Sequence, residues 1–186
     1  MLIFIKMKKE LSQKIEIPEG IEAEIQGNKV IVKGAEGVNE KEFSFVNLNF
    51  EKKGNEIIIG NKKSSKKEKR RMNTIAAHIR NMMRGVKEKF EYKLKICFSH
   101  FPITVEVKGN EALIKNFLGE KTPRKAKIPK GAEVKVEKEI ITIISPNIET
   151  AGQAAANFET ATRIVKRDRR VFQDGIFITS KCGEEI

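Results

Sequence analysis

The chain's only two aspartates lie in one strongly basic stretch, and they are the first residues to consider for chemistry. Asp168 and Asp174 both fall within "RIVKRDRRVFQDGIF". A pair of carboxylates can act as general acid and base, so one hypothesis is an RNA-processing enzyme that depends on divalent cations. Against it, the adjacent Arg167 and Arg169 should keep the Asp168 carboxyl ionised. Asp174 precedes a glycine, a pairing common in turns for backbone reasons. The pattern therefore favours structural roles for both aspartates.

Histidine and cysteine are too few and too scattered to predict a metal site. Cys97 and His100 form a Cys-x-x-His spacing, but zinc needs about four ligands and no second pair accompanies them. His78 falls inside a helical pattern, where a surface role is expected. Two cysteines 85 positions apart are typical of a reducing, intracellular setting. No phosphate-binding glycine motif occurs either. We expect no enzyme activity, no cofactor, no metal and no small-molecule substrate.

Positive charge is concentrated in three segments of the chain. The formal net charge is +12 over 186 residues, and residues 62–71 carry +6, residues 121–130 carry +5 and residues 166–170 carry +3. The rest of the chain is therefore slightly acidic. Focused basicity of this kind is typical of a phosphate-binding surface. Aromatic residues make up only 6%, so stacking on bases is not expected to be the main mode of binding. No apolar stretch is long enough to span a membrane.

The spacing of apolar residues predicts two helices that must position these segments. The first should begin at Ser64 or Ser65, and its cations oppose the helix dipole, which suggests an anion bound outside it. The second should run over residues 148–165, with Asn147 as its N-cap. The apolar face of the first helix should comprise Met72, Ile75, Ala76, Ile79, Met82, Met83, Val86 and Phe90.

The two halves of the chain repeat one design. Three pairs of segments match in the same order: "AEIQGNKVIVKG" with "VEVKGNEALIKN", "NEIIIG" with "KEIITI", and "IAAHI" with "AAANF". The first pair consists of alternating strands joined by a Gly-Asn turn. We therefore predict an α+β fold with two tandem duplicated domains, each an antiparallel sheet packed against one main helix. The domains are placed at residues 7–90 and 91–186, with residues 1–6 an extension, or translation starting at Met7.

Several segments together resemble a known family. The duplicated design, "GEKTPRKAKIP", "GQAAANFETATRI" and "KRDRRVFQDGIFI" are similar to the universal large-subunit ribosomal protein L-six, in its archaeal and eukaryotic form. The resemblance covers nearly the whole chain from Met7 onward and is strongest from about Met72 to the end. The ending "RRVFQDGIF" departs from the bacterial "PEPYKGKGI"-like ending, so bacterial contact residues there are not carried over.

The resemblance implies a structural constituent of the large ribosomal subunit, working in the cytoplasm as part of a ribonucleoprotein in translation. It implies binding to 23S rRNA near the stalk base and the translation-factor site, with large-subunit ribosomal proteins as neighbours. The second domain, with its basic tail, would make the main contact. The family's rRNA-binding role falls on Lys121, Thr122, Arg124, Lys125, Lys127, Arg167, Arg169, Arg170 and Gln173. A possible second basic contact rests on charge alone: Lys62, Lys63, Lys66, Lys67, Lys69, Arg70 and Arg71.

Local chemistry adds expectations for the site. Residues 119–131 should form a stiff basic loop or an irregular edge strand. Asp168 should hold one arginine in place, and Gly175 should turn the chain and bring Gln173 and Asp174 to the surface. The alternative functions are a general DNA- or nucleoid-binding module and the RNA-processing enzyme.

Overall fold

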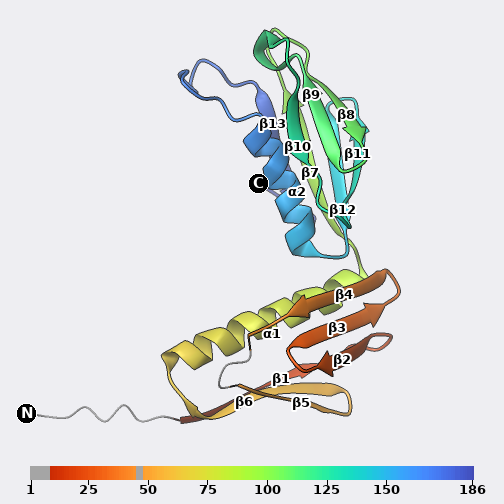
Figure 1. Ribbon diagram of the computed structural model, residues 1–186, viewed down its shortest axis with the longest axis vertical. Helices are drawn as coiled ribbons and strands as arrows, with labels where there is room; N and C mark the ends of the chain where they lie inside the picture. Colours follow the sequence, from red (N-terminus) through yellow and green to blue (C-terminus); the bar gives the residue numbers. More distant parts are fainter. Residues whose placement is uncertain (1–8, 45–47) are drawn as a thin grey trace, which may run out of the picture. The chain divides into compact units, whose positions relative to one another are not determined.

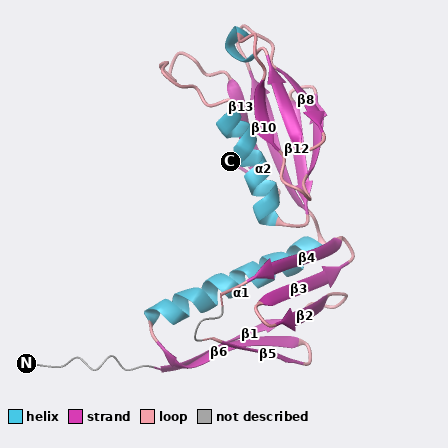
Figure 2. Ribbon diagram, viewed as in Figure 1, coloured by secondary structure: helices cyan, strands magenta, loops and turns pink. Residues whose placement is uncertain are grey.

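The computed structural model describes residues 9–44 and 48–186, which form two compact units divided between Glu88 and Lys89. The predicted extension at residues 1–6 and the possible start at Met7 lie outside the described residues. Figures 1 and 2 show the helices and strands of each unit. Each unit consists of antiparallel strands and one long helix, which confirms the predicted α+β class.

The first unit contains two three-stranded sheets and a 22-residue helix. One sheet has the order β1-β6-β5 and the other the order β2-β3-β4. Helix α1 packs on strands of both sheets. The elements are β1 (Lys9–Glu16), β2 (Glu22–Gln26), β3 (Lys29–Gly34), β4 (Gly37–Glu42), β5 (Asn49–Lys53), β6 (Glu56–Ser64) and α1 (Lys66–Lys87).

The second unit repeats this arrangement and adds two strands. Its three-stranded sheet has the order β10-β9-β8, and its five-stranded sheet has the order β11-β12-β7-β13-β14. Helix α2 packs on β10 of the first sheet and on β7, β12 and β13 of the second. The elements are β7 (Phe90–Cys97), β8 (Thr104–Lys108), β9 (Glu111–Lys115), the short η1 (Phe117–Gly119), β10 (Arg124–Lys127), β11 (Glu133–Glu137), β12 (Ile140–Ser145), α2 (Ile148–Ala161), β13 (Gly175–Lys181) and β14 (Glu184–Glu185).

The predicted repeat corresponds to real structural equivalence. The two Gly-Asn turns join β2 to β3 and β8 to β9, and Gly27 and Gly109 have φ angles of 58° and 60°. Glycine adopts this left-handed conformation without the steric cost of a Cβ atom. The pairing β1-β6-β5 recurs as β7-β12-β11, and β2-β3-β4 recurs as β8-β9-β10. The difference between the units is the β13–β14 ribbon, which adds to the free edge of β7.

Each unit has its own apolar core. In the first, Val32 of β3, Ile57 of β6 and Ile79 of α1 are fully buried. In the second, Leu94 of β7 and Phe158 of α2 are fully buried. Burying each such side chain contributes about 1.5–3 kcal/mol.

The structure corrects both helix ends predicted from spacing. Of the two predicted starts, Ser65 is the N-cap of α1. The helix ends at Lys87, and Phe90, predicted to lie on its apolar face, begins β7 instead. Asn147 caps α2 as predicted, with its Oδ1 accepting from the Glu149 N–H at 2.9 Å. The predicted end at residue 165 was wrong, because α2 stops at Ala161. The buried Thr162 hydroxyl accepts a hydrogen bond from the N–H of Ile176 at 3.0 Å, so the chain leaves the helix there to meet β13.

Candidate RNA interface

The first basic segment of the second domain contains β10, a sheet-edge strand. Among the described residues β10 pairs with β9 only, so of the two predicted forms, a stiff loop or an edge strand, residues 124–127 adopt the edge strand. Ala126 and Ile128 point into the core, while the alternate residues Lys125 and Lys127 are exposed. The preceding Lys121 and Thr122 are exposed in the loop after η1. The two-residue period of a strand thus sorts the segment into a buried apolar face and an outward basic face.

The second basic segment is the loop between α2 and β13. Asp168 accepts three hydrogen bonds from Arg170, from its N–H at 2.9 Å, its Nε at 3.2 Å and its Nη2 at 3.1 Å. These bonds hold the pKa of the Asp168 carboxyl below its usual value. The Arg167 guanidinium lies 4.8 Å from the centre of the Phe172 ring. Gln173 donates to the Arg170 carbonyl at 3.2 Å, which closes the loop upon itself.

Arg124 joins the two basic segments. Its Nη1 donates to the carbonyl oxygens of Ala161 at 3.0 Å and Arg163 at 3.2 Å, at the point where α2 ends. Its Nε and Nη2 donate to the Glu120 carboxylate at 2.8 and 2.6 Å, and its guanidinium lies 4.3 Å from the centre of the Phe117 ring. Arg124 therefore binds groups of its own domain, and its contacts bring residues 119–131 and the loop after α2 together.

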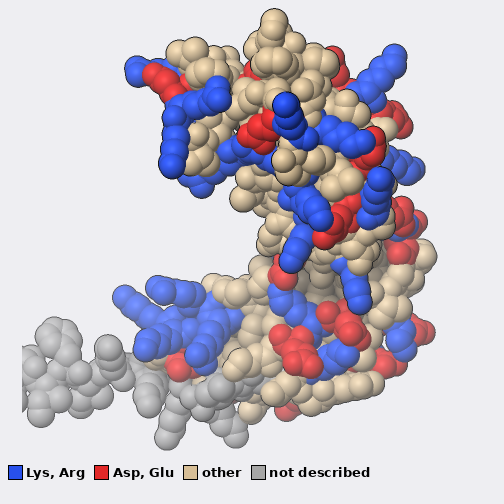
Figure 3. All heavy atoms as spheres, turned by 45° about the horizontal axis from the view of Figure 1, so that its top comes forward, with Lys and Arg blue, Asp and Glu red and all other residues tan. Residues whose placement is uncertain are grey.

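Most of the remaining predicted residues are exposed around this junction. Arg170 has a side chain that is 90% exposed despite its bond to Asp168. Lys125 lies 3.6 Å from the Glu111 carboxylate, a weak exposed pair. In the part of the chain that the structure describes, Lys121, Lys127 and Arg169 have no ion-pair partner. Figure 3 shows lysine and arginine side chains gathered over the loop between α2 and β13.

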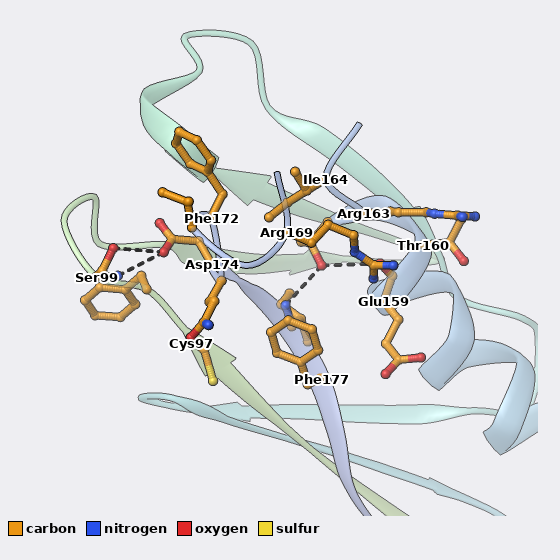
Figure 4. A pocket seen from close by; sticks show the side chains of 15 residues that line it. Cys97, Ser99, Glu159, Thr160, Arg163, Ile164, Arg169, Phe172, Asp174 and Phe177 are labelled. Atoms are coloured by element: carbon orange, nitrogen blue, oxygen red, sulfur yellow. Dashed lines mark hydrogen bonds between the residues drawn. The ribbon is translucent and has the colours of Figure 1, made fainter. Parts of the chain in front are cut away.

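The structure overturns the prediction that Asp174 reaches the surface. Asp174 is only 5% exposed, and its Oδ1 accepts from both the N–H of Ser99, at 3.1 Å, and the Ser99 hydroxyl, at 3.0 Å (Figure 4). Gly175 does not make a sharp turn but begins β13. A Cβ atom there would lie about 3.0 Å from the Phe177 ring, so the ring packs closely over this glycine. Gln173 alone of the pair is exposed, as predicted.

A buried, hydrogen-bonded Asp174 also removes the paired-carboxylate hypothesis. Asp168 is exposed and bonded to Arg170, whereas Asp174 is buried and bonded to Ser99. The two carboxylates thus have separate partners and do not face a common reacting atom. Within residues 9–44 and 48–186, no group of three or more potential metal-ligating side chains is present. Sequence reasoning missed Ser99, Glu120 and Phe117. The Ser99 contact is long-range, at 75 positions, and left no local signal, whereas the Glu120–Arg124 pair, four residues apart, was a local signal that the sequence offered.

The first domain carries a separate basic cluster at the start of α1. Ser65 caps the helix by accepting from the Lys67 N–H at 3.2 Å, and Glu68 accepts from the Ser65 N–H at 2.8 Å and from its hydroxyl. These bonds lower the pKa of Glu68. The cluster's exposed residues are Lys66, Lys67, Lys69, Arg70 and Arg71. The side chains of the remaining two candidates, Lys62 and Lys63, lie outside the described residues. Figure 3 shows this cluster as a dense basic surface.

Comparison with known proteins gives this arrangement a family. The model of the family described as "Ribosomal protein L6" matches residues 17–89 and 101–175. The chain belongs to the ribosomal protein L6 family. The family match falls in two segments, one in each domain, as expected for a duplicated fold. Membership makes the chain a structural component of the ribosome rather than an enzyme, as predicted.

Archaeal relatives of the L6 family match nearly the whole chain. The "Large ribosomal subunit protein uL6" of Methanobrevibacter smithii is 44% identical over 92% of this chain and 96% of the relative. The protein of the same name from Methanococcus vannielii is 41% identical over 95% of this chain and 97% of its own length. That from Sulfurisphaera tokodaii is 45% identical over 92% of each chain. These identities confirm the predicted resemblance to the archaeal form. Among the described residues, no helix is long and apolar enough to cross a membrane.

Proposed function

We propose that the chain binds 23S rRNA in the large ribosomal subunit and that its second domain, residues 91–186, makes the main contact. The observation that carries this proposal is the position of Arg124. Arg124 lies 37 positions from Ala161 and 39 positions from Arg163 in the chain. Its hydrogen bonds to their carbonyl groups therefore join two basic segments that are distant in sequence. A rigid surface with unpaired cations loses little conformational entropy when it binds a phosphate backbone.

The side chains around Arg124 divide into those that contact phosphates and those that position them. Lys121, Lys127 and Arg169 are exposed, with no ion partner among the described residues, and would neutralise phosphates directly, with release of counterions. Arg170 would bind through the guanidinium edge that Asp168 leaves open. Lys125, Arg167, Thr122 and Gln173 add contacts from the same two segments, whereas Arg124 holds the segments in place.

Recognition by this surface would depend on the shape of the RNA. A-form RNA has a deep, narrow major groove that side chains cannot read, so contacts fall on phosphates and 2′-hydroxyl groups. If about eight phosphates are engaged, log K should fall with log salt at a slope of about −6 to −7. A general DNA-binding module would not discriminate against duplex DNA in this way.

The location on the ribosome follows the resemblance to the family. We place the bound protein in the cytoplasm, near the stalk base and the translation-factor site of the large subunit, with other large-subunit ribosomal proteins as neighbours. The cluster at the start of α1 would contact a second segment of rRNA or a neighbouring protein. Its five described cations are all exposed at a helix start, where an external anion would offset their repulsion from the helix dipole.

The proposal is tested by binding of the full chain to deproteinised 23S rRNA over a range of salt concentrations. The triple variant Lys121→Gln, Lys127→Gln, Arg169→Gln should reduce the salt slope by about 2–3, at roughly 0.7–0.9 for each phosphate that is no longer neutralised. The matched control is Lys93→Gln, Lys95→Gln, Lys135→Gln, which removes three exposed charges from β7 and β11 of the same domain. An equal fall in affinity in both variants, or wild-type binding to duplex DNA as tight as to 23S rRNA, would contradict the proposal.

A further inference from the structure

The second domain contains a surface hollow, and the proposed phosphate contacts do not account for it. It has a volume of about 860 Å³ and opens where the end of β7, the end of α2, the following loop and the start of β13 meet. Figure 4 shows Phe172 and Asp174 on one side, Glu159, Thr160 and Arg163 on the other, and Phe177 between them. All of these side chains belong to one domain, so the hollow does not depend on how the two domains are arranged.

Aromatic side chains form part of the wall. Phe98 and Phe177 are 39% and 41% exposed although both line the hollow. The Phe177 ring lies close over the backbone of Gly175, where a Cβ atom would be about 3.0 Å from it. Phe172 is held by the Arg167 guanidinium, 4.8 Å from its ring centre. Three aromatic rings therefore line the hollow, and water at such rings is displaced favourably by a flat apolar ligand.

The polar groups of the hollow disfavour a phosphate inside it. Glu159 and Asp174 supply two carboxylates, each of which uses one oxygen on a hydrogen bond within the domain. Their remaining oxygens are acceptors that would repel an anion but accept from an amino group. Arg163 and Arg169 also line the hollow and would attract phosphates at its opening. An uncharged ring with an exocyclic amine, attached to phosphates on either side, matches this set of groups.

We propose that the hollow receives one unstacked, amino-bearing nucleobase of the bound rRNA, with Arg163 and Arg169 on its flanking phosphates. The inference rests on the proposed RNA-binding function and adds a single base contact to a surface that otherwise binds the backbone. Proteins commonly recognise single-stranded RNA by stacking splayed-out bases on aromatic and arginine side chains. Scarce aromatic residues are compatible with this contact, because three rings at one place are sufficient.

The test fills the hollow without changing charge. Thr160→Trp places a large side chain there from an exposed position of α2, and Gln153→Trp is the control at an exposed position of the same helix outside the hollow. Affinity of the full chain for deproteinised 23S rRNA should fall about ten-fold or more in Thr160→Trp, because one base can no longer stack, with an unchanged salt slope. One base should be protected from dimethyl sulfate by wild type and by Gln153→Trp but not by Thr160→Trp.

A second variant tests the same contact in case Thr160→Trp does not fold. Phe98→Leu removes an exposed ring and should weaken binding in the same direction, again with no change of slope. Wild-type affinity and protection in both variants overturn the base contact, and so does a reduced salt slope in Thr160→Trp, which would indicate a phosphate in the hollow. Normal rRNA affinity with loss of incorporation into large subunits would assign the hollow to a protein partner instead. A wild-type chain with no salt-dependent affinity would overturn the proposed function itself.

Discussion

One oxygen of the Asp174 carboxylate accepts two hydrogen bonds from Ser99, from its N–H at 3.1 Å and its hydroxyl at 3.0 Å. The two residues are 75 positions apart, so this contact ties the end of the basic loop to the segment that follows β7. It lies beside the hollow and directly before β13. The position of the loop relative to the sheet thus depends on the buried Asp174 and its bonds to Ser99, as well as on the exposed charges.

Asp174→Ala should destabilise the second domain by about 1–3 kcal/mol, because it removes two hydrogen bonds to a charged acceptor that is itself buried. Asp168→Ala is the matched control, since Asp168 is exposed and its removal strands no buried group. Urea unfolding of the full chain, followed by a probe in each domain, would measure the difference. Equal stability of the two variants would show that the Ser99 contact is dispensable.

Arg124→Ala should lower stability by about 1.5–3 kcal/mol, because it removes charge-assisted hydrogen bonds to Glu120 and to the end of α2. Arg124→Lys should recover little of this, because an ammonium cannot reproduce the guanidinium fork. Hydrogen exchange of the amides in the loop after α2 should also quicken in both variants. Wild-type exchange in Arg124→Ala would contradict the joining role assigned to this side chain.

The Arg124–Glu120 pair should also give stability a defined pH dependence. The hydrogen bonds that Arg124 donates, together with its positive charge, hold the pKa of the Glu120 carboxyl below its ordinary value of 4.5. Since the folded pKa lies below the unfolded one, the contribution is present above about pH 4.5 and is lost as pH falls through the folded value. The stability difference between wild type and Arg124→Ala should therefore shrink on acidification. A difference that stays constant from about pH 7 to about pH 3 would exclude the ion pair as its source.

Removal of the first-turn cations of α1 should affect the stability of the protein and its binding to the large subunit in opposite directions. Lys66→Gln with Lys67→Gln should keep or raise stability, by about 0.3–1 kcal/mol per residue, because cations oppose the dipole at a helix start. The same variant should bind large subunits less tightly. Lys87→Gln, in the last turn of the same helix, should do the opposite, with a small drop in stability and unchanged binding. Thermal unfolding and gradient co-sedimentation would measure the two effects.

Gly34→Ala should destabilise the first domain, since a Cβ atom there would lie 2.8 Å from both the Val86 side chain and the Val86 carbonyl oxygen. Overpacking of this kind costs about 1–3 kcal/mol. Gly60→Ala is the matched control, because its Cβ atom would meet its nearest neighbour at an ordinary 3.5 Å. Denaturant midpoints of the two variants should differ accordingly, and a tolerated Gly34→Ala would show that α1 can shift away from β3.

Local periodicity was enough to predict the elements and their duplication. The Gly-Asn turns, most of the buried face of α1, the N-cap Asn147 and a helix start at Ser64 or Ser65 all follow from contacts within a few residues, whereas for residues 119–131 the sequence left a loop and an edge strand open. Focused charge likewise indicated which segments expose most of the cations that we propose to face a polyanion. Such properties are readable because a strand or helix imposes its period on the sequence regardless of what packs against it.

Long-range contacts decided what the sequence left open. The length of α2 depends on Thr162 bonding to Ile176, and the burial of Asp174 depends on Ser99. In "KTPRKAK" nothing distinguishes Arg124 from the neighbouring exposed cations. In the folded domain, however, its guanidinium donates to carbonyl groups 37 and 39 positions away. Whether a charged side chain faces solvent or satisfies a backbone carbonyl is set by which polar groups the folded chain leaves unpaired nearby. Those groups come together only when the sheets and helix pack.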